Sequence, residues 1–253
     1  MTSAIAERWK NPAVVDVFAR HHYAGPHLEE PAFHHYPHAR LTRHIADILA
    51  VTAARNGAKI EADVLPVAAA YHDAGAALWP AMRHAFAIPE DLAADIAARD
   101  LPTLHMPEAK VESAKETIRE TSRLVPCTTD TARCLSQADL MAGGLLSHDA
   151  VFLHGTYRLY KESKQLEDRP LPDDRDVLRD ELLEFGVASH ETLSTYLEED
   201  LALGPHQRNQ RGQSMFNILG ARKIRLLERA QFARILEVNL DYITDSSLES
   251  RQL

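Results

Sequence analysis

The chain has 253 residues, of which 45% are hydrophobic and 26% are charged, an ordinary balance for a globular protein with a sizeable core. Its formal net charge of -9 argues against a surface that grips a nucleic-acid backbone, because such a surface needs clustered lysine and arginine. No stretch approaches the roughly 20 apolar residues of a membrane span, and the N-terminus lacks the apolar core of a secretory signal. We therefore expect a cytoplasmic protein that contacts neither a membrane nor polymeric nucleic acid and acts on a small molecule.

Helix-forming residues dominate the sequence, and no alternating strand pattern is found. We therefore predict an all-α fold: one domain over residues 1–253, with a core at about 36–146 and an extension of further helices at about 147–253. Apolar spacing, caps and helix-breaking residues predict helices at about 12–22, 38–56, 61–74 and 89–99, one opened by Pro107, one within 127–144 capped by Thr128, Thr129 or Asp130, and then 146–165, 174–185, 189–203 and 214–243.

The last predicted helix carries apolar residues at helical spacing and a basic face that includes Arg222 and Arg225. One interpretation packs this helix on the body with its basic face in solvent, and the other makes it a homodimer contact. Cys127 and Cys134 lack the spacing of a metal or redox motif, so we expect two core thiols rather than a disulfide framework.

The stretch "VAAAYHDAGA" places His72 and Asp73 at the end of a run of small apolar residues. Burying two ionisable groups there is costly unless something pairs with them. A hydrogen-bonded His-Asp pair would be a sufficient explanation if the dipeptide stood alone. However, Asp139 also shares a face with apolar residues of its helix, and His44 is expected to share the inward face of Leu41 and Ile48. Three helices would thus point ionisable groups inward, and one shared cation would offset several burial costs together.

The order His44, His72-Asp73, Asp139 resembles the H…HD…D signature of the HD-domain superfamily of metal-dependent phosphohydrolases. The flanking stretches "TRHIADIL", "VESAKETI" and "ADL" are similar to the small bacterial phosphohydrolase group of that superfamily. The similarity covers about residues 36–146 and extends more loosely to about 185. It implies a compact HD-domain bundle with His44, His72, Asp73 and Asp139 as ligands of one divalent ion at its centre.

Two histidines and two carboxylates suit Mn, Fe, Ni, Co, Zn or Mg, and their spacing does not choose among these ions. Such an ion would polarise a phosphoryl oxygen and lower the pKa of bound water. Relatives with two metals add further histidines, and here the corresponding interval offers only His84 and His105, so one metal is favoured. Some HD nucleotidases carry a carboxylate three residues after the aspartate of the pair, where this chain has Ala76 and Ala77.

Four further residues are candidates for catalysis or substrate binding. Glu112 is a candidate base, with a structural role near a helix start as its alternative. His38 could orient water or touch a phosphate. Arg40 and Arg43 flank the first predicted ligand and could meet a substrate phosphate, although solvated arginines are commoner.

We therefore predict a metal-dependent phosphohydrolase that cleaves a phosphate monoester or phosphoanhydride of a small molecule such as a nucleotide. Two other classes remain open. The first is an HD-type oxygenase, hydratase or lyase that acts on a small molecule without phosphate, and the oxygenase form would need extra ligands near His84 or His105. The second is a nucleotide-binding protein with little or no catalysis.

Overall fold

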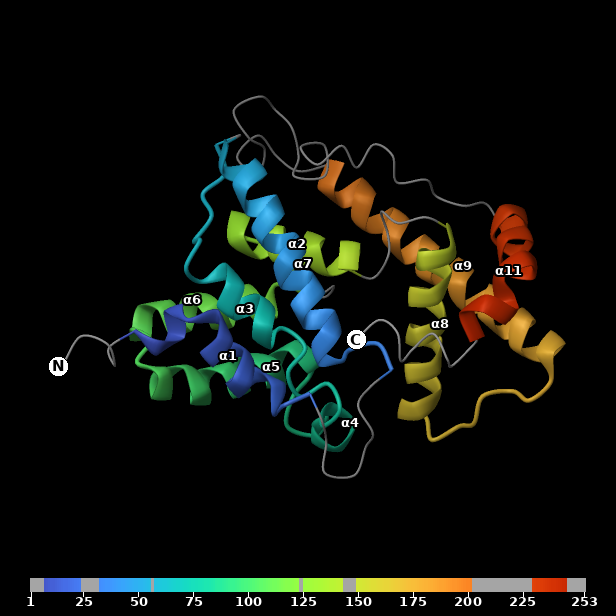
Figure 1. Ribbon diagram of the computed structural model, residues 1–253, viewed down its shortest axis with the longest axis horizontal. Helices are drawn as coiled ribbons and strands as arrows, with labels where there is room; N and C mark the ends of the chain where they lie inside the picture. The colour runs from blue at the N-terminus through green and yellow to red at the C-terminus, as the bar shows by residue number, and fades with distance from the viewer. Residues whose placement is uncertain are drawn as a thin grey trace. The chain divides into compact units, whose positions relative to one another are not determined.

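The computed structural model describes residues 7–23, 32–55, 57–122, 125–142, 149–201 and 229–244. These residues form helices joined by turns and contain no strand, so the predicted all-α class is confirmed for the part of the chain that the structure describes (Figure 1). The chain divides into two compact units, residues 1–142 and residues 143–253. Whether the two units form the single domain predicted over residues 1–253 stays a prediction.

The first unit is arranged around the short helix α3 (Leu65–Tyr71), which contacts five other helices of the unit (Figure 1). These helices are α1 (Pro12–Arg20), α2 (Tyr36–Arg55), α5 (Pro89–Asp100), α6 (Glu108–Arg119) and α7 (Asp130–Leu140). All residues of α3 except Pro66 are buried, and three consecutive alanines let its neighbours approach closely. The unit is completed by α4 (Trp79–Met82) and two 3₁₀ turns, Arg8–Lys10 and Leu101–Leu104.

Local signals in the sequence account for several helix starts. Asn11 caps α1 by accepting a hydrogen bond from the amide of Ala13 at 3.1 Å, and Pro12 takes the first helical position. Among the three candidate caps of α7, the structure selects Thr129, whose hydroxyl accepts from the amide of Ala132 at 3.0 Å. This cap fixes where α7 begins, and Asp139 lies at the other end of the helix.

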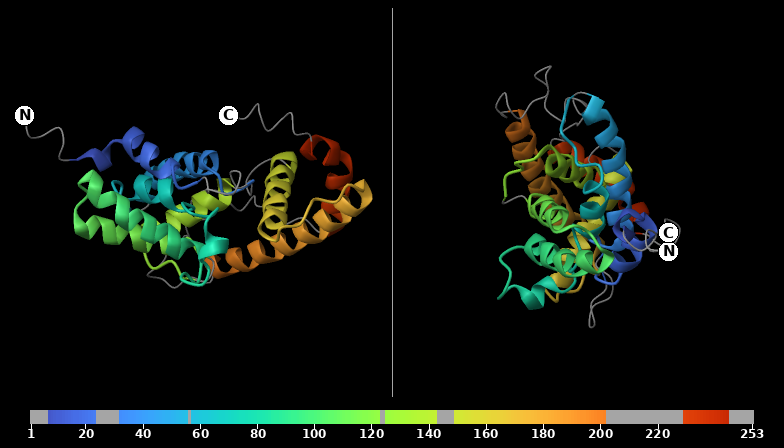
Figure 2. Two further views of the ribbon diagram at one scale, coloured as in Figure 1. Left: turned by 90° about the horizontal axis from the view of Figure 1, so that it is seen from below. Right: turned by 90° about the vertical axis from the view of Figure 1, so that its left-hand side faces the viewer.

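The second unit contains α8 (Asp149–Leu166), α9 (Arg175–Leu201) and α11 (Arg229–Thr244), which pack pairwise against one another (Figure 2). The sequence predicted a break between helices at 174–185 and 189–203, whereas α9 runs through without one. Gly186 explains the difference, because an ideal Cβ at this position would lie only 2.1 Å from Cζ of Phe232. The glycine therefore serves close packing of α11 on α9 rather than the end of a helix.

Of the predicted helix at 214–243, the structure describes the part that forms α11, while residues 214–228 lie outside the described residues. The thiol of Cys134 is buried and that of Cys127 is partly buried, and neither forms a disulfide. None of the helices in the described ranges is both long and apolar enough to cross a membrane.

Candidate metal centre

The centre of the site is the residue pair at the end of α3. His72 follows the helix directly, and its side chain is only 1% exposed. Nδ1 of His72 lies 2.9 Å from the carbonyl oxygen of Ala69, and because a carbonyl can only accept, Nδ1 must donate. The other ring nitrogen, Nε2, then presents its lone pair to the interior when the ring is neutral.

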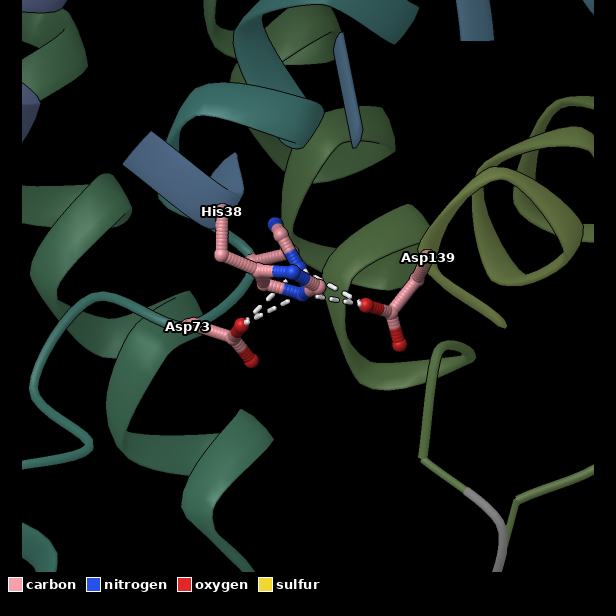
Figure 3. A group of neighbouring side chains, drawn as sticks. His38, Asp73 and Asp139 are labelled. Carbon is pink, nitrogen blue, oxygen red and sulfur yellow. Dashed lines mark hydrogen bonds and ion pairs between the residues drawn. The ribbon is translucent and has the colours of Figure 1, made fainter. Parts of the chain in front are cut away.

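His38 and Asp139 reach this pair from two other helices. His38 lies in the first turn of α2 and is 5% exposed, and its Nε2 atom is 2.8 Å from Oδ1 of Asp139 near the end of α7. The same nitrogen is 3.6 Å from Oδ2 of Asp73. Figure 3 shows the two carboxylates on opposite sides of the histidine rings, with the carboxylate oxygens directed at the ring nitrogens.

His72 joins both carboxylates to the group. Its Nε2 atom lies 3.0 Å from Oδ2 of Asp73 and 3.3 Å from Oδ1 of Asp139. One donor atom from each of His38, His72, Asp73 and Asp139 lies within 4.8 Å of the others. Two ligand atoms about 2.1 Å from one ion are roughly 3.0–3.4 Å apart at tetrahedral or right angles, so the two separations from Nε2 of His72 fit a shared ion.

Two buried atoms of the group lack the hydrogen bonds that burial normally requires. Nε2 of His72 and Oδ2 of Asp73 are both inaccessible and have no hydrogen-bond partner among the described residues, although they lie close to each other. An unsatisfied buried polar atom costs about 1–3 kcal/mol, and a cation bound to both atoms would remove that cost. The four donors, two nitrogens and two oxygens, therefore fit a divalent metal ion.

The electrostatic environment of the group favours a positive charge between the two carboxylates. Burial opposes the charged form of His72, but the carboxylates of Asp73 and Asp139 outweigh it and raise the pKa of the ring well above its usual value. Burial likewise opposes ionisation of Asp139, but the hydrogen bond from His38 and the nearby ring of His72 hold its pKa well below the usual range. Without a metal, the carboxylates of Asp73 and Asp139 therefore favour a proton on His72.

His44, the predicted first ligand, does not join the group. Its side chain is exposed, as are those of Leu41 and Ile48, which are 47% and 55% exposed. The buried face of α2 is instead the one that carries His38, Thr42 and Leu49. The prediction that His44 points inward is wrong, because α2 buries the other of its two apolar faces, and His38 takes the place beside Asp139.

The other candidates from the sequence are exposed or form ion pairs. Glu112 is exposed and forms an ion pair with Lys115 on its own helix. Arg40 is exposed, and Arg43 forms an ion pair with Asp16 of α1.

Arg43 also lines a cavity of about 240 Å³ together with Trp9 of the first 3₁₀ turn, Val15 of α1 and Val67 of α3. His84 and His105, which a second metal would need, are both exposed and outside the group.

The structure also identifies an acidic residue that the sequence analysis missed. Glu90 lies in the first turn of α5, and its charge interacts with those of Asp73, Asp139 and His34. Pro89 marks the helix start in the sequence, and an acidic residue directly after it is usually explained by the helix dipole. Only the packing of α5 brings this carboxyl group within electrostatic reach of the site.

No family model, curated protein or solved structure matches the chain. The helical fold and the group of two histidines and two aspartates are compatible with an HD-type metal site.

Proposed function

We propose that the protein is a hydrolase that uses one divalent metal ion to cleave a phosphate monoester or phosphoanhydride of a small molecule, with a nucleotide as the preferred class. One observation carries the proposal: four ionisable donors from three helical segments converge in the interior, and two of their buried atoms lack hydrogen bonds. When bound, a divalent ion supplies the positive charge that polarises a phosphoryl oxygen and makes water more acidic.

The ligands in this proposal are His38, His72, Asp73 and Asp139. Mn, Fe, Ni, Co, Zn and Mg all remain candidates, because a mixed set of imidazole and carboxylate ligands serves each of them. The ion also explains how a chain of net charge -9 could hold an anionic substrate, since it provides local positive charge within an acidic protein. A small substrate suits this arrangement better than a polymer, which would need a basic surface.

The first test compares two histidines of the same helix. We expect His38→Ala to lose the bound metal, because it removes a donor 2.8 Å from Asp139, whereas the exposed His44→Ala variant should keep it. Metal analysis of the untreated proteins measures this directly. Metal loss in the His44→Ala variant with retention in His38→Ala would show that the ligand set is wrong.

The second test addresses the reaction. We expect the wild-type protein, supplied with Mn²⁺ or Ni²⁺, to release phosphate from members of a panel of nucleotides and other phosphate monoesters. Asp73→Ala should abolish bound metal and phosphate release together. A metal-loaded protein that binds nucleotides, as seen in thermal stabilisation, but turns none over would contradict the hydrolase and support the nucleotide-binding alternative.

A further inference from the structure

The turn that carries the metal-binding pair lies directly against helix α5. Gly75, two residues after Asp73, has a φ angle of +88°, a conformation that side chains other than glycine rarely adopt. An ideal Cβ on Gly75 would lie 2.7 Å from Cδ1 of Ile96 and 3.1 Å from Cγ of Leu92. Both of these α5 side chains are buried. The middle of α5 is therefore held against the backbone of the site, and Glu90 lies in the first turn of the same helix.

The side chain of Glu90 has the environment of a functional group rather than of a solvated helix-start acid. Its Oε2 atom is buried and has no hydrogen-bond partner among the described residues, as is also true of Nε2 of His72 and Oδ2 of Asp73. Burial, together with the nearby negative charges of Asp73 and Asp139, raises the pKa of Glu90, while a hydrogen bond from its own backbone amide and the charge of His34 act in the opposite direction. A carboxylate with a raised pKa holds a proton more readily, which is the property that a proton acceptor needs.

The proposed hydrolysis lacks an assigned proton acceptor. The four donors of the group are committed to the ion, and Ala76 and Ala77, which follow the metal-binding pair, carry no ionisable group. Glu112 is exposed and paired with Lys115. Glu90 is the acid whose charge acts on the two metal-binding carboxylates and whose oxygen is buried without a partner.

We propose that the carboxylate of Glu90 is the general base of this site. The proposal rests on the proposed hydrolysis. As the oxygen of the attacking water forms its bond to phosphorus, Glu90 takes one proton from that water. The electron pair of the breaking P–O bond leaves with the oxygen of the alcohol or phosphate group. The proton on Glu90 then passes to that oxygen or to solvent, which restores the carboxylate.

The test uses the full chain loaded with Mn²⁺ and p-nitrophenyl phosphate as the probe. Glu90→Gln keeps the size of the side chain but cannot accept the proton, so we expect kcat to fall by about 10²–10⁴-fold, the usual contribution of a general base. Bound metal and the midpoint of thermal unfolding should stay at wild-type values. The matched control is Glu108→Gln, which changes an exposed acid in the first turn of α6 and should leave all three quantities unchanged.

A second variant separates proton transfer from structure. Glu90→Ala leaves space for a small carboxylate, so added formate should restore kcat in proportion to its concentration, which a merely structural role of Glu90 would not allow. Formate should not rescue Asp73→Ala, because that variant lacks the ion.

Each contrary result has its own meaning. An active Glu90→Gln variant, or one that loses stability but keeps its kcat, overturns the role of Glu90 and leaves the proposed hydrolysis standing. Loss of metal from Glu90→Gln overturns the role as well, because Glu90 would then be a ligand. A metal-loaded wild-type protein that cleaves neither this probe nor the nucleotide panel overturns both proposals.

Discussion

The buried ring of His72 links metal binding to pH at the scale of a single residue. Asp73 and Asp139 raise the pKa of His72 against the effect of burial, so in the metal-free protein the ring holds its proton to a higher pH than an ordinary histidine. A cation can bind Nε2 only after that proton has left. Protons and metal ions therefore compete for the same atom.

We predict that metal affinity falls as the pH is lowered from 8 to 6, by up to about tenfold per unit for the one proton released. The free energy of unfolding of the metal-free protein should change in the opposite direction and fall as the pH rises. A raised pKa in the folded state contributes stability below the unfolded value, about 6.5, and this stability is lost as the pH rises through the folded pKa. Titration calorimetry in buffers of different ionisation enthalpy measures the released proton.

Thermal unfolding with and without a chelator measures how the stability of the metal-free and metal-bound protein depends on pH. His44→Ala removes an exposed imidazole from the same helix and should reproduce both wild-type pH dependences. Metal affinity that is independent of pH between 6 and 8 would mean that His72 is not a ligand.

Three of the four donors could be predicted from the sequence. The fourth, His38, could not, because the sequence does not show which face of α2 is buried. His72, Asp73 and Asp139 stand out because ionisable residues interrupt apolar faces. Helix α2, however, has two apolar faces, and the larger residues Leu41 and Ile48 lie on the exposed one. Its buried face carries small residues, because α3 and α7 pack closely there. Choosing between His38 and His44 therefore required knowledge of which helices approach.

At the scale of elements, α5 packs closely against the turn at Gly75, and this contact holds α5 beside the metal-binding pair. The positive φ angle of Gly75 and the 2.7 Å approach of Ile96 leave no room for a side chain. Glu90 and Asp73 are 17 residues apart in the sequence, so this contact, and not the chain between them, brings their elements together.

We predict that Gly75→Ala lowers the free energy of unfolding by about 2 kcal/mol or more, since it combines backbone strain with overpacking. Denaturant titration measures the loss. Gly57→Ala is the control, because Gly57 also has a positive φ angle of 94° but is exposed, so it tests the backbone contribution alone. Adding Ile96→Val to Gly75→Ala removes the clashing methyl group and should recover part of the loss. Equal losses of unfolding free energy in the Gly57→Ala and Gly75→Ala variants would show that the contact of Gly75 with Ile96 does not contribute to stability.

The positions of the helices were easier to predict from the sequence than whether a long helix is interrupted. Periodicity and caps located α1, α2, α5, α6 and α7 to within a few residues. The break predicted between residues 185 and 189 was wrong, because α9 continues through Gly186, which makes room for a side chain of α11. The partner in this case is Phe232, 46 residues away, and no local pattern points to it.

At the scale of the whole molecule, the metal site and both tryptophans belong to the unit formed by residues 1–142. The chain has two tryptophans, Trp9 and Trp79, so tryptophan fluorescence reports on this unit alone. All four donors of the group also lie within it. Metal binding should therefore be visible as stabilisation of the fluorescence transition.

We predict that metal at 100 times its dissociation constant stabilises this unit by about 2.7 kcal/mol, which corresponds to a rise of about 5–10 °C in its fluorescence-detected Tm. His38→Ala should unfold at the same temperature with and without metal. A rise of similar size in the His38→Ala variant would place the stabilising ion elsewhere in the molecule.

The distance along the chain between the first and last donors also affects when the protein can acquire its ion. His38 and Asp139 are 101 residues apart, and at about 5–20 residues per second a ribosome needs roughly 5–20 s to make that stretch. Throughout this interval the nascent chain has an incomplete set of donors. The ion that is finally loaded is therefore selected by the supply that meets the finished chain, so growth medium and expression rate should influence which metal is recovered.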